Sequence, residues 1–240
     1  MGPNTMKMIE CEDSMGGIFT AIYRAYEKRY VLEETHLVLA NRYNPVLFAS
    51  YEYSDEDTGK AAKVMRTLQR EFGSYVYEKI VDALFSGEED KADVVFHLTV
   101  NALKKGLGEE ALSDLTNPYV IRTMELARNV FYEKHHFYGF LRFRELSNGI
   151  LYGVISPKNQ MLYFMMEHFS DRLPMENFLI YDERAKEYAF HLKGKPWIYI
   201  DEITGKQLVG SNNISRDEDL YATGFTAFCK SISIKERENK

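Results

Sequence analysis

The 240-residue sequence has only two cysteines, Cys11 and Cys229, and no C-x-x-C pair. An iron–sulfur cluster or a cysteine zinc site is therefore not expected, although a single disulfide stays open. No secretory signal is visible, and no apolar run approaches the roughly 20 residues that cross a bilayer. We expect a cytoplasmic protein with no membrane contact, and we read residues 1–5 as a leader outside the fold.

Catalytic signatures are missing as well: there is no Gly-rich phosphate loop with Lys, no G-x-S-x-G and no H-E-x-x-H. Gly16 and Gly17 open a helix after a strand, as at an anion-binding helix N-terminus. Glu12 and Asp13 beside them would repel phosphate, so close packing is the better interpretation. The six histidines show no metal-ligand spacing. We expect no metal and no cofactor.

Aromatic side chains are abundant, with 17 Tyr, 15 Phe and 1 Trp, while 45% hydrophobic and 28% charged residues are typical of a globular protein. The length suggests one large domain or two small ones. The net charge of −6 excludes a uniformly basic nucleic-acid coat but allows a local basic patch.

Apolar periodicity predicts a helical first half followed by a β-rich second half. The first half opens with strand, helix and strand at 6–12, after Asp13-Ser14, and at 46–53. Asn117-Pro118 begins the last helix of this half. The second half contains strands at 137–146 and 150–156, joined by Ser147-Asn148-Gly149, a helix at 161–169, strands at 178–182, 188–192 and 197–200, and a helix at 217–231.

The segregation of helices and strands predicts an α+β fold. We expect a helical N-terminal half with a short β-α-β opening, packed on a C-terminal antiparallel sheet of order β-β-α-β-β-β-α. The absence of a Gly/Ser- or Pro-rich linker favours subdomains 6–132 and 133–240 that share an interface, or one domain.

The segment 126–144 interleaves cations with aromatic rings, which suits a nucleic-acid strand. On a strand, Tyr138, Phe140, Arg142 and Arg144 would share one exposed face. An equally weighted alternative is that both faces are core and the arginines pair with carboxylates. The full set of candidate nucleic-acid-binding residues is Arg128, Lys134, His136, Tyr138, Phe140, Arg142, Arg144, Arg172 and Arg184.

A second group follows farther along the chain. His168 and Arg172 are four residues apart on the predicted helix, and Asp182-Glu183-Arg184 ends a strand. These residues could hold a phosphate or act as acid and base, which makes His136, His168, Asp182 and Glu183 the catalytic candidates. A solvated turn with a surface ion pair is the favoured alternative.

Several short motifs resemble those of a bacterial family of DNA repair or DNA metabolism proteins built on a domain of unknown function. The resemblance runs from about Ile9 to Asn239, and His136–Leu146 is its most specific part. The other motifs are Glu12–Ile18, Ala21–Tyr23, Ala127-Arg128, His168-Phe169, Arg172–Pro174, Ile180–Arg184, Ser231-Ile232, Ile234, Glu236-Arg237 and Asn239.

Members of this family are encoded beside a radical-SAM protein, and some are fused to a uracil-DNA-glycosylase-like domain. The resemblance thus implies a role in DNA modification or repair. We expect this chain to lack the glycosylase part and to end earlier than many members. Tyr181 stands where the family pattern has His, which weakens a proton-transfer role at that position.

Three functions follow as hypotheses. The leading one is an accessory protein that binds DNA, single-stranded or damaged, and presents it to a radical-SAM or glycosylase partner. The second is an enzyme that acts on a DNA base or phosphate. The third is a protein-interaction module without DNA contact, which the net charge of −6 favours.

Overall fold

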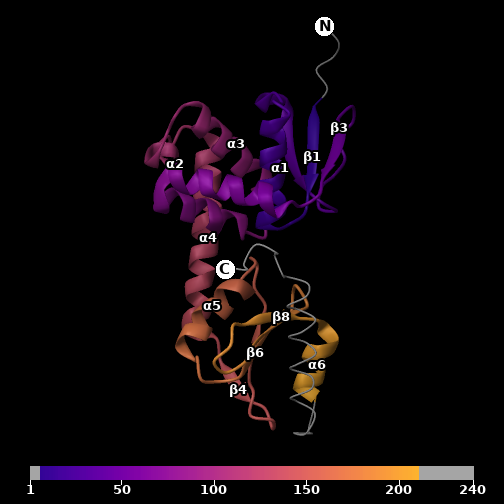
Figure 1. The fold of residues 1–240 in the computed structure, drawn as a ribbon, viewed down its shortest axis with the longest axis vertical. Coiled ribbons are helices and arrows are strands. Elements are labelled where there is room, and N and C mark those ends of the chain that lie inside the picture. Colours follow the sequence, from indigo (N-terminus) through magenta and orange to yellow (C-terminus); the bar gives the residue numbers. More distant parts are fainter. Residues whose placement is uncertain (1–5, 211–240) are drawn as a thin grey trace, which may run out of the picture. The chain divides into compact units, whose positions relative to one another are not determined.

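A computed structural model describes residues 6–210, and the chain divides into two compact units, Met1–Tyr132 and Glu133–Lys240 (Figure 1). The fold is α+β with a helical first half, as predicted. The predicted helix at 217–231, Cys229 and the motifs from Ser231 onward lie outside the described residues. No helix in the described range is long and apolar enough to cross a membrane.

The first unit opens with a three-stranded parallel sheet of order β2-β1-β3. Helix α1 (Met15–Glu27) connects β1 to β2, and the Ser14 side chain caps it by accepting the Gly17 N–H at 2.8 Å. The cap agrees with the predicted helix start. The strands are β1 (Lys7–Cys11), β2 (Thr35–Leu39) and β3 (Ser50–Ser54), with a short 3-10 turn, η1 (Leu32–Glu34), before β2.

The helices of the first unit are α2 (Thr58–Leu84), α3 (Lys91–Lys104) and the start of α4 (Pro118–Phe140), with a 3-10 turn, η2 (Glu109–Leu112), before α4. The apolar spacing predicts two helices, one marked by Val64, Leu68 and Phe72 and the next by Tyr75, Ile80 and Leu84, and α2 indeed consists of two helical segments. The kink between them lies at Gly73, whose φ of 73° is accessible because glycine has no Cβ. The largest side chains of the core are those of Phe19, Phe72, Phe96, Leu68 and Ile80.

The second unit contains a five-stranded sheet of order β4-β5-β6-β7-β8. The prediction of a purely antiparallel sheet is wrong, because β5 and β6 run parallel. Helix α5 lies between them in sequence and returns the chain to the same end of the sheet, as a parallel pair requires. The elements are β4 (Phe143–Glu145), β5 (Leu151–Ile155), α5 (Leu162–Arg172), β6 (Phe178–Asp182), β7 (Glu187–His191), β8 (Ile198–Ile200) and α6 (Glu202–Gly210).

The predicted strand at 137–146 is wrong over its first half, since α4 continues to Phe140. The backbone N–H of Leu141 donates to the Phe137 carbonyl at 2.9 Å, and the His136 and Phe140 rings stack one turn apart. Only Phe143–Glu145 is a strand. Tyr138 and Phe140 therefore do not share a strand face with Arg142 and Arg144.

Candidate metal centre and candidate nucleic-acid interface

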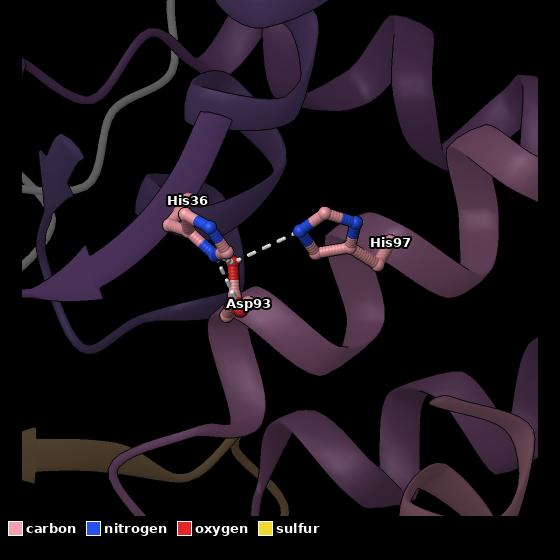
Figure 2. A group of neighbouring side chains, drawn as sticks. All are labelled: His36, Asp93 and His97. Carbon is pink, nitrogen blue, oxygen red and sulfur yellow. Dashed lines mark hydrogen bonds and ion pairs between the residues drawn. The ribbon is translucent and has the colours of Figure 1, made fainter. Parts of the chain in front are cut away.

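Three side chains of the first unit converge around one carboxylate (Figure 2). His36 comes from the edge strand β2, while Asp93 and His97 lie one turn apart near the start of α3. One potential ligand atom from each residue lies within 4.8 Å of the others. Two imidazoles and one carboxylate form a donor set that suits a transition-metal ion.

The Asp93 carboxylate is the centre of this cluster. Its Oδ1 accepts the backbone N–H of Leu37 at 3.0 Å, and His36 Nδ1 lies 3.2 Å from Oδ1 and 3.1 Å from Oδ2. Burial by itself raises the pKa of Asp93, but the His36 and His97 imidazoles outweigh this effect and lower it below its usual value. The hydrogen bond to Asp93 correspondingly raises the pKa of His36.

His97 is the most enclosed member of the cluster, with 3% of its surface exposed. Its ring stacks on Tyr119 at 4.4 Å with an interplanar angle of 10°, and the Phe96 ring meets it edge-on. These contacts aim Nε2 toward Asp93. The Nε2 atom lies 3.5 Å from Asp93 Oδ1, which is within ion-pair range, but it has no hydrogen bond.

The sequence analysis did not find this cluster. Asp93 and His97 stand four residues apart on one helix face, which was the only readable signal. The third member, His36, lies 57 residues before Asp93, and its strand was not predicted. Only the fold brings these residues together.

The predicted nucleic-acid residues of the second unit are concentrated at the end of α4 and just after it. His136 and Phe140 stack at 4.9 Å with an interplanar angle of 29°, and 66% of Phe140 is exposed. Arg142 donates to the Gly139 and Leu141 carbonyls at 3.2 and 3.4 Å. The exposed Arg144 side chain lies 5.0 Å from the centre of the Tyr152 ring.

The other candidates of the second unit have separate surroundings. Lys134 lies over the Phe164 ring at 4.6 Å, and Tyr138 stacks on His168 at 4.0 Å. Burial and the nearby Arg172 lower the pKa of His168. Exposed Arg184 donates to the Pro157 carbonyl at 3.4 Å.

The four catalytic candidates make no direct contact with one another among the described residues. Asp182 is 97% buried, and its Oδ1 accepts the backbone N–H groups of Arg184 and Ala185 at 2.9 and 3.0 Å, so it closes the turn after β6. Burial raises the pKa of Asp182 against these two hydrogen bonds. Within the described chain, no hydrogen bond, ion pair or ring contact joins any two of His136, His168, Asp182 and Glu183.

Arg128 belongs to the first unit, unlike the other nucleic-acid candidates. Its side chain lines a cavity of about 430 Å³ with Lys79, Phe131 and Tyr132. The predicted strip is therefore divided between the two units. We confine the candidate interface to the residues from Lys134 to Arg144.

The Gly16-Gly17 start of α1 supports the packing interpretation. Ser14 Oγ donates to the Glu56 carboxylate at 2.7 Å, and this carboxylate occupies the space that a Cβ on Gly16 would need. A Cβ on Gly17 would approach the Glu12 carbonyl oxygen to 2.8 Å. The chain's own carboxylate thus lies at this helix N-terminus.

Residues 89–240 match a family described as a domain of unknown function, DUF4130. The matched range includes Asp93, His97 and the whole second unit, whereas His36 precedes it. No curated protein matches the chain.

Proposed function

The chain belongs to the DUF4130 family, and we propose that it binds nucleic acid through the end of α4 and the segment that follows. The main support is the exposed stack of His136 and Phe140, with Arg142 and Arg144 next in sequence. An exposed aromatic face gives a base somewhere to stack, and a guanidinium group pairs with phosphate.

The charge of this segment favours a polyanion. From Lys134 to Arg144 the sequence has three cations and no carboxylate, whereas the whole chain carries a net charge of −6. The helix C-terminus adds negative partial charge, but Arg142 already donates to two of the terminal carbonyls. The other N–H groups of Arg142 are available for a phosphate.

Single-stranded nucleic acid fits this segment better than a duplex. The exposed ring of Phe140 can stack only on a base that is free of its partner. His136, the catalytic candidate in this segment, makes no contact with the other three in the described chain, and we propose that the segment binds DNA. We therefore propose a cytoplasmic accessory protein of DNA metabolism that presents DNA to a radical-SAM or glycosylase partner, in line with the resemblance of its motifs.

The test is fluorescence anisotropy of labelled single- and double-stranded DNA with the full chain at several salt concentrations. We expect tighter binding to the single strand. The slope of log K against log salt should become about 1.4 units less steep in the Arg142→Ala/Arg144→Ala variant, at about 0.7 per lost phosphate contact. Phe140→Ala should weaken binding by roughly 5- to 150-fold, the effect of losing one stacked base.

Lys193 and Lys195 provide a matched control, because both are exposed cations of the same unit. Lys193→Ala/Lys195→Ala removes the same charge and should leave the salt slope unchanged. If this control loses as much affinity as the arginine variant, binding is diffuse and the proposed site is wrong. If the unaltered chain does not bind DNA at low salt, the protein-interaction hypothesis takes precedence.

A further inference from the structure

We propose that His36 Nδ1, the Asp93 carboxylate and His97 Nε2 bind one divalent transition-metal ion, Zn²⁺ by preference, with water in the remaining position. This site lies within the first unit and does not depend on nucleic-acid binding. Figure 2 shows both imidazoles turned toward the same carboxylate.

The spacing of the donor atoms fits a zinc ion. Zinc binds imidazole nitrogen and carboxylate oxygen at about 2.0–2.2 Å, so neighbouring ligands of a tetrahedral site are about 3.3–3.5 Å apart. His36 Nδ1 lies 3.1 and 3.2 Å from the two Asp93 oxygens, and His97 Nε2 lies 3.5 Å from Oδ1. All three donor atoms lie within 4.8 Å of one another, so any wider pair would need to close to about 3.3–3.5 Å around the ion.

The surroundings of His97 support a bound metal ion independently of the distances between the donor atoms. Its Nε2 is buried and makes no hydrogen bond, although the ring is fixed by Tyr119 and Phe96. Leaving a buried polar atom without a hydrogen bond destabilises a folded protein. A metal ion would give this nitrogen a partner without moving the ring from its stack.

The chemistry of the three ligands indicates which metal ion would bind, and their number and exposure indicate what kind of metal site they would form. Two imidazoles favour Zn²⁺ over Mg²⁺ or Ca²⁺, which prefer oxygen ligands. Three protein ligands leave one tetrahedral position open, as in catalytic rather than structural zinc sites. The His36 and Asp93 side chains are 27% and 24% exposed, so solvent reaches the cluster from one side.

A second feature strengthens the carboxylate as a ligand. The backbone N–H of Leu37 donates to Asp93 Oδ1, so the residue after His36 also orients Asp93. Strand β2 thus supplies one ligand and positions another. The ion would join β2 to α3 and add stability to the first unit through binding to the folded state alone.

The experiment measures metal binding by the full chain after treatment with a chelator and removal of that chelator. Zn²⁺ is titrated against a chromophoric chelator, and Co²⁺ is added separately as a spectroscopic probe. We expect one equivalent of Zn²⁺ to bind, visible Co²⁺ bands of a four- or five-coordinate site, and a higher Tm with Zn²⁺. Each of His36→Gln, Asp93→Asn and His97→Gln should weaken binding by about tenfold or more.

The Gln and Asn substitutions preserve side-chain size, and circular dichroism verifies that each variant is folded. His136→Gln is the control, because it removes an exposed imidazole beside His135 in the second unit. It should bind Zn²⁺ as the unaltered chain does. The proposal is wrong if Zn²⁺ does not bind stoichiometrically, if folded His36→Gln and His97→Gln bind normally, or if His136→Gln alone abolishes binding.

Discussion

The buried Lys91 ammonium allows a test of how the first unit tolerates charge in its core. Lys91 is fully buried, and its Nζ lies 2.5 Å from Asp13 Oδ1 and donates to the Ser86 carbonyl at 2.7 Å. Asp13 also pairs with Arg42 at 2.5 Å. Burial lowers the pKa of Lys91, while Asp13 opposes this effect. The perturbation is Asp13→Asn, which keeps the side-chain shape and removes the anion.

The expected loss in the free energy of unfolding depends on which member of the Asp13–Lys91 pair is left without an opposite charge. Asp13→Asn leaves the enclosed Lys91 ammonium without its countercharge, because the amide oxygen of Asn and the Ser86 carbonyl are both neutral acceptors, and removing one partner of a buried ion pair costs about 3–5 kcal/mol. Lys91→Met instead leaves Asp13 paired with Arg42, whose side chain is 37% exposed. The loss should then be about 0–2 kcal/mol, since an apolar side chain of similar length replaces the ammonium.

The assay is urea unfolding followed by circular dichroism at 222 nm, which reports mainly on the helices of the first unit. Lys206→Met is the matched control, because Lys206 pairs with Glu202 on an exposed helix surface and its loss should leave the urea midpoint nearly unchanged. The reasoning is refuted if Lys91→Met destabilises the chain as much as Asp13→Asn. It is also refuted if Asp13→Asn stays within 1 kcal/mol, roughly the effect of a surface pair.

Two further predictions concern groups whose pKa is shifted by burial. Burial, with Asp13 second, raises the pKa of Cys11 to about 12, so the native thiol should resist iodoacetamide at about pH 8 and react only in urea. Peptide mapping by mass spectrometry measures this, and rapid native labelling of Cys11 would contradict it. The pKa of His168 is lowered from its usual value of 6.5, so protonating this imidazole costs more in the folded chain than in the unfolded chain. The free energy of unfolding should therefore be highest above pH 6.5 and should decrease as the pH drops below that value. Urea unfolding is followed by the fluorescence of Trp197, the single tryptophan. The midpoint urea concentration should decrease as the pH is lowered from about 7 to about 5, and it should decrease less in His168→Gln. An equal decrease in both proteins would exclude His168 as the cause.

Local signals in the sequence predict several elements well. Ser14 caps the start of α1 because its hydroxyl oxygen accepts a hydrogen bond from a backbone N–H that has no partner within the helix. Pro118 begins α4 because its fixed φ suits the first turn of a helix. Asn148-Gly149 lies in the turn between the antiparallel strands β4 and β5. Such signals depend on only a few neighbouring residues.

The errors arise where two structures share one pattern. The residues around Gly139 are rich in aromatic side chains, as strands often are, yet His136 and Phe140 also fall one helical turn apart, and α4 continues through them. The parallel pairing of β5 with β6 depends on where α5 leads the chain, which a local pattern does not specify.

The candidate metal centre was beyond the reach of sequence periodicity. Asp93 and His97 could be read as a helix-face pair, but nothing local indicates that His36 joins them. The nucleic-acid candidates stay a prediction, made because most of them lie close together in the sequence. The predicted arrangement of these residues is wrong. A strand would place Tyr138 and Phe140 on the same face, whereas the helix α4 places them on different faces.

The packing at the start of α1 also constrains how this sequence can vary. A side chain on Gly16 would overlap the Glu56 carboxylate, so Glu56 would have to swing away and lose its hydrogen bond with Ser14. Positions 16 and 56 are therefore coupled through space, although 40 residues separate them. We expect relatives with a larger residue at position 16 to carry a shorter one at position 56. Where Glu56 is lost, the Ser14 hydroxyl at this helix start would be left without its carboxylate acceptor.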